Sequence, residues 1–105
     1  MTLDWDQHPE AEEELAVSAE WYERRERGLG YELLRAAEEA VESTLDPAVQ
    51  WGFYRSRQSD PQLYSRSIAG FPIDVIHLRT KTSVFVIAYA PERRRPGYWA
   101  HRLPH

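Results

Sequence analysis

Apolar residues in the first half of the chain recur at the spacing of helices, after a short alternating stretch. Residues 3–6 alternate apolar and acidic side chains, which predicts a first strand. Pro9 suits a first helical turn, and we expect Gly28 to provide the left-handed cap at the helix end. The helix predicted over residues 9–27 carries one apolar stripe, made of Ala11, Leu15, Ala19 and Tyr22.

A second apolar stripe predicts a second helix, which runs as far as Asp46-Pro47, because proline disfavours helical backbone in the residue before it. The stripe consists of Leu33, Ala37, Ala40, Val41 and Leu45. Only residues 28–30 separate the two helices, so we expect an antiparallel helical hairpin.

The second half of the chain has short apolar runs between turn residues, which is typical of strands. Residues 63–68, 71–78 and 84–90 predict three strands in an antiparallel meander. The last run is apolar on both faces, so we expect it inside the sheet, with the helices on one face. Residues 48–62 are irregular, and their aromatic side chains are expected to cover one end of the core: Trp51, Phe53 and Tyr54.

Together these elements predict one α+β domain over residues 1–105, in the order β-α-α-β-β-β. We expect the antiparallel helical hairpin to pack on a twisted antiparallel sheet. Eight side chains should be largely buried in this arrangement: Leu15, Tyr22, Leu33, Val41, Ile73, Val75, Phe85 and Ile87.

Charge is distributed unevenly along the chain. The net charge is −4, but residues 1–50 contribute −10 and residues 51–105 contribute +6. The basic half can attract an anionic partner although the whole chain is acidic, because salt screens each field within about 10 Å.

The composition argues against several classes of protein. There is no cysteine for a disulfide or thiolate site, and the histidines lack zinc-site spacing, so we expect neither metal nor cofactor. The sequence contains no glycine-rich phosphate loop and no nucleophile elbow. No apolar run could span a membrane and residues 1–6 do not resemble a signal peptide, so we expect a cytoplasmic protein without a membrane partner.

The segment Arg93-Arg94-Arg95-Pro96-Gly97-Tyr98-Trp99 follows the last predicted strand. Guanidinium groups bind phosphate or carboxylate, and tyrosine and tryptophan rings offer flat faces to bases or partner side chains. One interpretation is an exposed recognition tail, whose removal would leave a folded domain. The alternative is a solvated basic tail whose Trp99 packs back on the core.

Arginines near the strand ends allow a further interpretation. Arg66, Arg79, Lys81 and the three arginines of residues 93–95 could converge at one end of the sheet. A metal-free ribonuclease could use such a cluster to stabilise a pentavalent phosphate, with a tyrosine or histidine, such as His101, moving protons. Otherwise these arginines bind an acidic protein partner or lie in water. We expect His77 to be a half-buried strand residue and the glutamates of the first helix to be solvated.

Several segments, taken in order, resemble the RelE/ParE superfamily of type II toxins. They are His8–Leu15 followed by Ala19–Glu23, Gly28-Leu29-Gly30 followed by Leu33 and Leu34, Phe71-Pro72-Ile73, and Arg93–Trp99, which is similar to the tail of ParE-like members. The resemblance implies a toxin that is encoded beside a small antitoxin and neutralised by it.

The resemblance implies two possible targets. RelE-like members cut mRNA in the ribosome with a cluster of Lys, Arg, Tyr or His, whereas ParE-like members poison DNA gyrase and lack that cluster. This chain has a single lysine, and Pro91-Glu92 stands where the family often has histidine, which favours the ParE-like side.

We therefore expect a gyrase inhibitor that binds its antitoxin or target through residues of the C-terminal segment: Arg93, Arg94, Arg95, Tyr98 and Trp99. One alternative is a ribosome-dependent mRNA endoribonuclease that uses Arg66, Arg93 and Tyr98. Another is a non-toxic, partner-binding remnant of the family.

Overall fold

The computed structural model describes residues 2–48 and 52–104. In chain order its elements are β1 (Asp4–Gln7), α1 (Pro9–Arg25), α2 (Leu29–Ser43), the 3-10 helix η1 (Tyr54–Ser56), β2 (Tyr64–Ser67), β3 (Ile73–Arg79), β4 (Ser83–Pro91) and the 3-10 helix η2 (Ala100–Arg102). The predicted α+β order β-α-α-β-β-β is confirmed. Trp51, one of the aromatics expected to cover the core, lies outside the described residues. Neither α1 nor α2, nor any other described helix, has the length and apolar character needed to cross a membrane.

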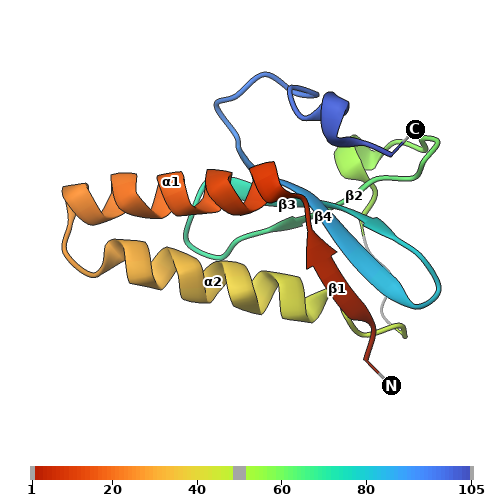
Figure 1. Cartoon of the computed structure of the whole chain (residues 1–105), viewed down its shortest axis with the longest axis horizontal. Helices are drawn as coiled ribbons and strands as arrows, with labels where there is room; N and C mark the ends of the chain where they lie inside the picture. Colours follow the sequence, from red (N-terminus) through yellow and green to blue (C-terminus); the bar gives the residue numbers. More distant parts are fainter. Residues whose placement is uncertain (1, 49–51, 105) are drawn as a thin grey trace.

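The sheet is mixed, so the prediction of a wholly antiparallel sheet is wrong (Figure 1). Its strand order is β1-β4-β3-β2, in which β2, β3 and β4 form the predicted meander. The short β1 pairs parallel with β4, with Trp5 opposite Val84 and Gln7 opposite Val86. An alternating pattern predicts a strand but contains no information about the direction of its neighbour. As its two apolar faces predicted, β4 lies inside the sheet.

Two glycines make the tight joint between the helices possible. Gly28 has a φ of +91°, but it caps the start of α2, because α1 ends at Arg25 and its C-cap residue is Glu26. A Cβ atom on Gly30 would lie 2.5 Å from the carbonyl oxygen of Ala19, so only glycine allows this approach. The Glu23 carboxylate accepts hydrogen bonds from the backbone N–H groups of Gly28 (2.9 Å) and Gly30 (3.0 Å). Glu23 therefore stabilises the positive end of α2.

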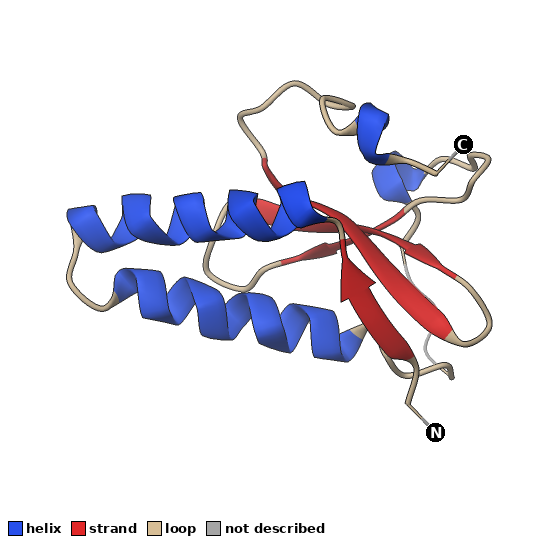
Figure 2. Cartoon of the chain, viewed as in Figure 1, coloured by secondary structure: helices blue, strands red, loops and turns tan. Residues whose placement is uncertain are grey.

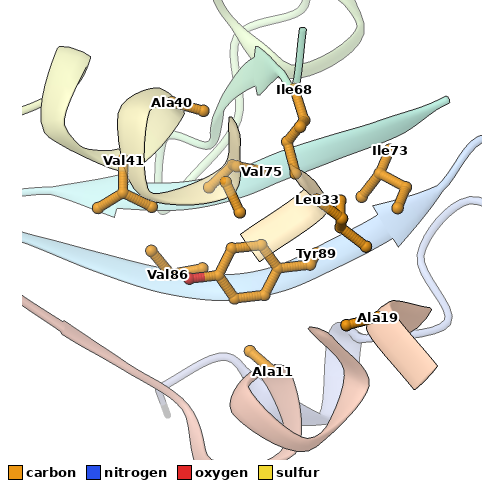
Figure 3. Packing of buried hydrophobic residues seen from close by; sticks show 11 residues of the cluster. Ala11, Ala19, Leu33, Ala40, Val41, Ile68, Ile73, Val75, Val86 and Tyr89 are labelled. Atoms are coloured by element: carbon orange, nitrogen blue, oxygen red, sulfur yellow. The ribbon is translucent and has the colours of Figure 1, made fainter. Parts of the chain in front are cut away.

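The main core lies between the helical hairpin and one face of the sheet (Figure 3). The helix α1 contributes small side chains, Ala11 and Ala19, so its backbone can approach the sheet closely. The larger buried side chains come from α2 and the sheet, and they include Leu33, Val41, Ile73, Val75, Val86 and Tyr89. Burial of this apolar surface is the main stabilising contribution to the fold.

Five of the eight side chains that the sequence predicts to be buried are buried: Leu33, Val41, Ile73, Val75 and Ile87. The other three, Leu15, Tyr22 and Phe85, are only partly buried but pack against the two cores. Each of these three borders a surface depression, so one side of it remains in contact with water.

A β-bulge in the centre of the sheet turns additional apolar side chains toward the opposite face. The register of β3 and β4 shifts between Ile76 and His77, so Ile87 is an extra residue on β4. A second core forms on this face from Leu63, Ile76, Ile87, Ala88 and Trp99. The 3-10 helices η1 and η2 lie side by side, and Trp99 at the start of η2 packs on Tyr54 of η1 (Figure 2). The sheet is therefore covered on both faces.

The exposures of two neighbouring leucines on α2 provide a test of this packing. Leu33 is fully buried, whereas 43% of Leu34 is exposed. We expect Leu33→Ala to lower the free energy of unfolding by about 2–5 kcal/mol, through lost transfer energy and the cavity left behind. Leu34→Ala is the matched control and should cost much less. Urea denaturation measures both, and equal losses would contradict the arrangement of α2.

Candidate binding site on the C-terminal segment

Glu14 of α1 is a buried carboxylate that joins three parts of the chain. Its side chain is only 9% exposed. It accepts hydrogen bonds from the backbone N–H of Tyr89 (2.9 Å), from Arg102 Nη1 (3.0 Å) and from the Tyr98 hydroxyl. Arg94 Nη1 lies 3.7 Å from the second carboxylate oxygen. The expectation that the α1 glutamates are solvated is therefore wrong for Glu14.

Arg102 of η2 is the buried partner of Glu14. Its side chain is 7% exposed, and Nη1 also donates to the carbonyl oxygen of Ile87 at 3.2 Å. The pairing of β1 with β4 ends at Val86, so β1 is absent beside Ile87 and Tyr89. Arg102 and Glu14 thus bond backbone groups of β4 beyond the end of β1, and these groups would otherwise be buried without partners.

The aromatic residues of the C-terminal segment belong to the fold. Trp99 is 4% exposed and meets Tyr54 of η1 edge to face, with ring centroids 5.2 Å apart. Tyr98 is half-buried, and the Arg94 guanidinium lies 3.7 Å from its ring centroid. Burial, together with the hydrogen bond to Glu14, raises the pKa of the Tyr98 hydroxyl above its ordinary value.

These contacts decide between the two interpretations of the segment. The structure contradicts a wholly exposed recognition tail, because Trp99 packs on the second core as the alternative proposed. Removing residues 93–105 would therefore take Trp99 and Arg102 out of the interior. Figure 1 shows the segment passing over the N-terminal part of α1 before it reaches η1.

The arginines of the segment remain on the surface. Arg93, Arg94 and Arg95 are all exposed, and Arg94 and Arg95 border a cleft of about 180 Å³. We call this the arginine cleft; its other lining residues are Tyr54, Arg55, Asp74, Ile76, Ala90, Pro91, Glu92, Pro96, Tyr98 and Trp99. It combines three guanidinium groups with aromatic walls, and Asp74 and Glu92 are the two acids within it.

The backbone is unusual where η1 meets the arginine cleft. Arg55 and Ser56 have φ angles of +54° and +56°, in the left-handed region that residues other than glycine seldom adopt. Such conformations cost about 1–3 kcal/mol each and are concentrated at binding and active sites. This strain is the observation that marks the Arg55 side of the cleft as a candidate functional site.

The other cations considered from sequence do not join this cleft. Arg79 ends β3 and Lys81 lies in the turn before β4, whereas residues 93–95 follow the opposite end of β4, about 25 Å away at 3.3 Å per residue. The prediction that these groups converge at one end of the sheet is therefore wrong. The Arg79 side chain instead donates to the Pro47 carbonyl at 2.9 Å.

Arg66 likewise lies apart from the arginine cleft and from Tyr98, which lines it. It lies on the edge strand β2, two strands from β4, opposite Val75. Val75 packs in the core between sheet and helices, so cross-strand pairing puts Arg66 on the helix side of the sheet. The floor of the arginine cleft, Ile76 and Ala90, is on the other side. Arg66 and Tyr98, two residues of the ribonuclease alternative, thus lie on opposite sides of the sheet.

Histidines contribute little to the site. His101 Nε2 lies 3.1 Å from a Glu10 carboxylate oxygen, and this contact lowers the pKa of Glu10. His77 is fully buried, beyond the half-burial expected, and burial lowers its pKa to about 4. Its ring stacks on Tyr64 of β2, with centroids 5.8 Å apart. His77 is therefore neutral near pH 7 and acts in packing.

The lowered pKa of His77 predicts a pH dependence of stability. The unfolded chain takes up a proton near the ordinary pKa of 6.5, and the folded chain does so only near pH 4. This contribution to stability is therefore present above pH 6.5 and is lost as pH falls to 4, by about 3 kcal/mol. His77→Phe keeps a ring but cannot take up a proton, so its free energy of unfolding should not show this loss. The difference in unfolding free energy between the unmodified chain and the variant should therefore change by about 3 kcal/mol between pH 7 and pH 4. If the unfolding free energies of the two chains change equally from pH 7 to pH 4, the lowered pKa of His77 is contradicted.

The buried ion pair predicts a second stability effect. Glu14→Gln leaves Arg102 as an uncompensated buried charge, so we expect a loss of about 3–5 kcal/mol in unfolding free energy. Glu13→Gln removes the same charge from an exposed neighbour on α1 and should change stability by less than about 0.5 kcal/mol. Thermal or urea unfolding measures both, and similar values for the two variants would refute the role of Glu14.

Sequence reasoning missed Glu14, Arg102 and Arg55. One signal was available for Glu14, since it follows Ala11 by three residues and precedes Leu15, and so borders the apolar stripe of α1. Arg102 and Arg55 lie in irregular segments that have no periodic pattern. Their positions depend on contacts that only the folded chain makes.

Comparison of the chain with protein-family models, with curated proteins and with solved structures finds no match. The class that the fold and site define is a small α+β protein with a preformed basic cleft. Any likeness to the RelE/ParE superfamily rests on the sequence segments and on the element order.

Proposed function

We propose that this chain is the toxin of a type II toxin–antitoxin system, of the RelE/ParE type, and that it inhibits DNA gyrase by protein contact. A cognate antitoxin neutralises it. The element order and the basic C-terminal segment support this proposal, together with the segments that resemble the superfamily. The observation that carries it is the arginine cleft, where exposed guanidinium groups stand on a segment fixed by the buried Glu14–Arg102 pair.

The arginine cleft is better suited to binding a protein partner than to catalysing proton transfer. The Tyr98 hydroxyl donates its hydrogen bond to Glu14, and its raised pKa makes it a poor acid at neutral pH. Arginine and tyrosine are the residues that most often dominate contact energies at protein interfaces. A segment that is already ordered also loses less entropy when a partner binds. Cytoplasmic gyrase is therefore the target that we propose for the cleft.

Charge reversal in the cleft tests the proposal. Arg95→Glu and Arg55→Glu should each weaken inhibition of gyrase supercoiling by roughly 10- to 100-fold, because each replaces a contacting cation by an anion. Arg57→Glu makes the same change two residues after Arg55, outside the cleft lining, and should retain activity. Unfolding midpoints establish that all three variants fold. Equal inhibition by all of them would remove the cleft from the mechanism.

The same variants separate the alternatives when they are expressed in cells. Gyrase-linked DNA breaks are expected, with growth inhibition that a co-expressed antitoxin relieves. Codon-positioned mRNA cuts that disappear with Tyr98→Phe would instead favour a ribosome-dependent endoribonuclease. A chain that binds an antitoxin but never inhibits growth would be a non-toxic remnant.

A further inference from the structure

A second basic site lies on α1, outside the arginine cleft. Trp21 is 37% exposed, and two guanidinium groups from different parts of the chain surround its ring. The Cζ atom of Arg25 lies 4.2 Å from the ring centroid, and that of Arg93 lies 5.6 Å from it. These cation–π contacts hold two long, exposed side chains near one point.

Neither guanidinium forms an ion pair with a carboxylate of the described residues. Stacking on a ring occupies the face of a guanidinium and leaves its N–H edge able to donate. Arg25 and Arg93 therefore present unused donors from a preorganised position.

A small depression adjoins this pair. It has a volume of about 50 Å³, and its lining is largely apolar: Ser18, Trp21, Tyr22, Pro72, Ile73, Pro91 and Arg93. A water-sized group needs about 10–15 Å³, so the depression holds about three to five such groups. A valine or leucine side chain has this size, whereas a nucleobase is too large.

We propose that Trp21, Arg25 and Arg93 form a docking site for a protein segment that carries an acidic residue next to a short aliphatic one. The carboxylate binds the two guanidinium groups, and the aliphatic side chain fills the depression beside Tyr22 and Ile73. Arg93 connects the site to the C-terminal segment, but the docking does not depend on the cellular target proposed above.

The surrounding charge favours a peptide over a nucleic acid. Glu20 and Glu23 flank Trp21 on α1, and residues 1–50 carry a net charge of −10. A continuous phosphate backbone would be repelled along this helix, whereas a single carboxylate meets only the local arginine pair. The positive charge of Arg25 and Arg93 is thus complementary to a single carboxylate side chain.

Selection from a random nine-residue peptide library on the purified full chain tests the proposal. Enriched peptides should carry Asp or Glu within two residues of Val, Leu or Ile. These peptides are then synthesised with a fluorescent label. Their affinity for the Arg25→Glu and Arg93→Glu variants should be roughly 10- to 100-fold lower than for the unmodified chain, because charge-assisted hydrogen bonds are lost. Replacing the aliphatic residue of the peptide by glycine should also weaken binding.

Arg24→Glu is the matched control, since it makes the same charge change on the neighbouring residue of α1, and Arg24 makes no cation–π contact with Trp21 among the described residues. Its affinity should stay within about twofold of the unmodified chain. The proposal is overturned if no acidic–aliphatic peptides are enriched, if Arg24→Glu and Arg25→Glu lose affinity equally, or if a ten-nucleotide single strand displaces the peptides at lower concentration. This assay requires no toxicity, so its failure is distinct from failure of the gyrase proposal.

Discussion

The buried pair of Glu14 and Arg102 holds the C-terminal segment against α1 and β4. Removing two charges from water is costly, and their attraction offsets this only when further hydrogen bonds satisfy both groups. Here the Tyr98 hydroxyl and the backbone N–H of Tyr89 donate to Glu14, and Arg102 Nη1 donates to the carbonyl oxygen of Ile87, while the buried Arg102 Nε has no hydrogen-bond partner among the described residues. One interaction thus joins α1, β4 and the C-terminal segment.

The surface chemistry follows from this anchoring. Because the segment is fixed at Tyr98, Trp99 and Arg102, its arginines are presented from two defined positions: Arg95 borders the arginine cleft, and Arg93 reaches Trp21 on α1. The proposed gyrase contact and the proposed docking site at Trp21 therefore share one feature: buried contacts hold the segment in place, and exposed arginines extend from it. Such preorganisation lowers the entropy lost on binding.

Errors in the sequence-based predictions have specific physical causes. The alternation of residues 3–6 predicts β1 as a strand but not its parallel pairing with β4, because alternation is the same in either direction. The recognition-tail interpretation treated Trp99 and residues 93–95 alike because they are close in sequence. In the folded chain Trp99 is buried and the three arginines are exposed. The expected convergence of Arg79 with residues 93–95 failed because these residues lie at opposite ends of β4.

The sequence by itself determined the α+β order, the extent of the helices within about three residues, the internal position of β4 and the basic character of the second half of the chain. These features depend on local periodicity and composition, which short stretches of chain contain. Only the tertiary structure decided that Glu14 is buried, that Tyr98 bonds to it, and that Arg55 and Arg95 share a cleft. These contacts join residues that are far apart in sequence, so a pattern within a short stretch of chain cannot predict that they meet.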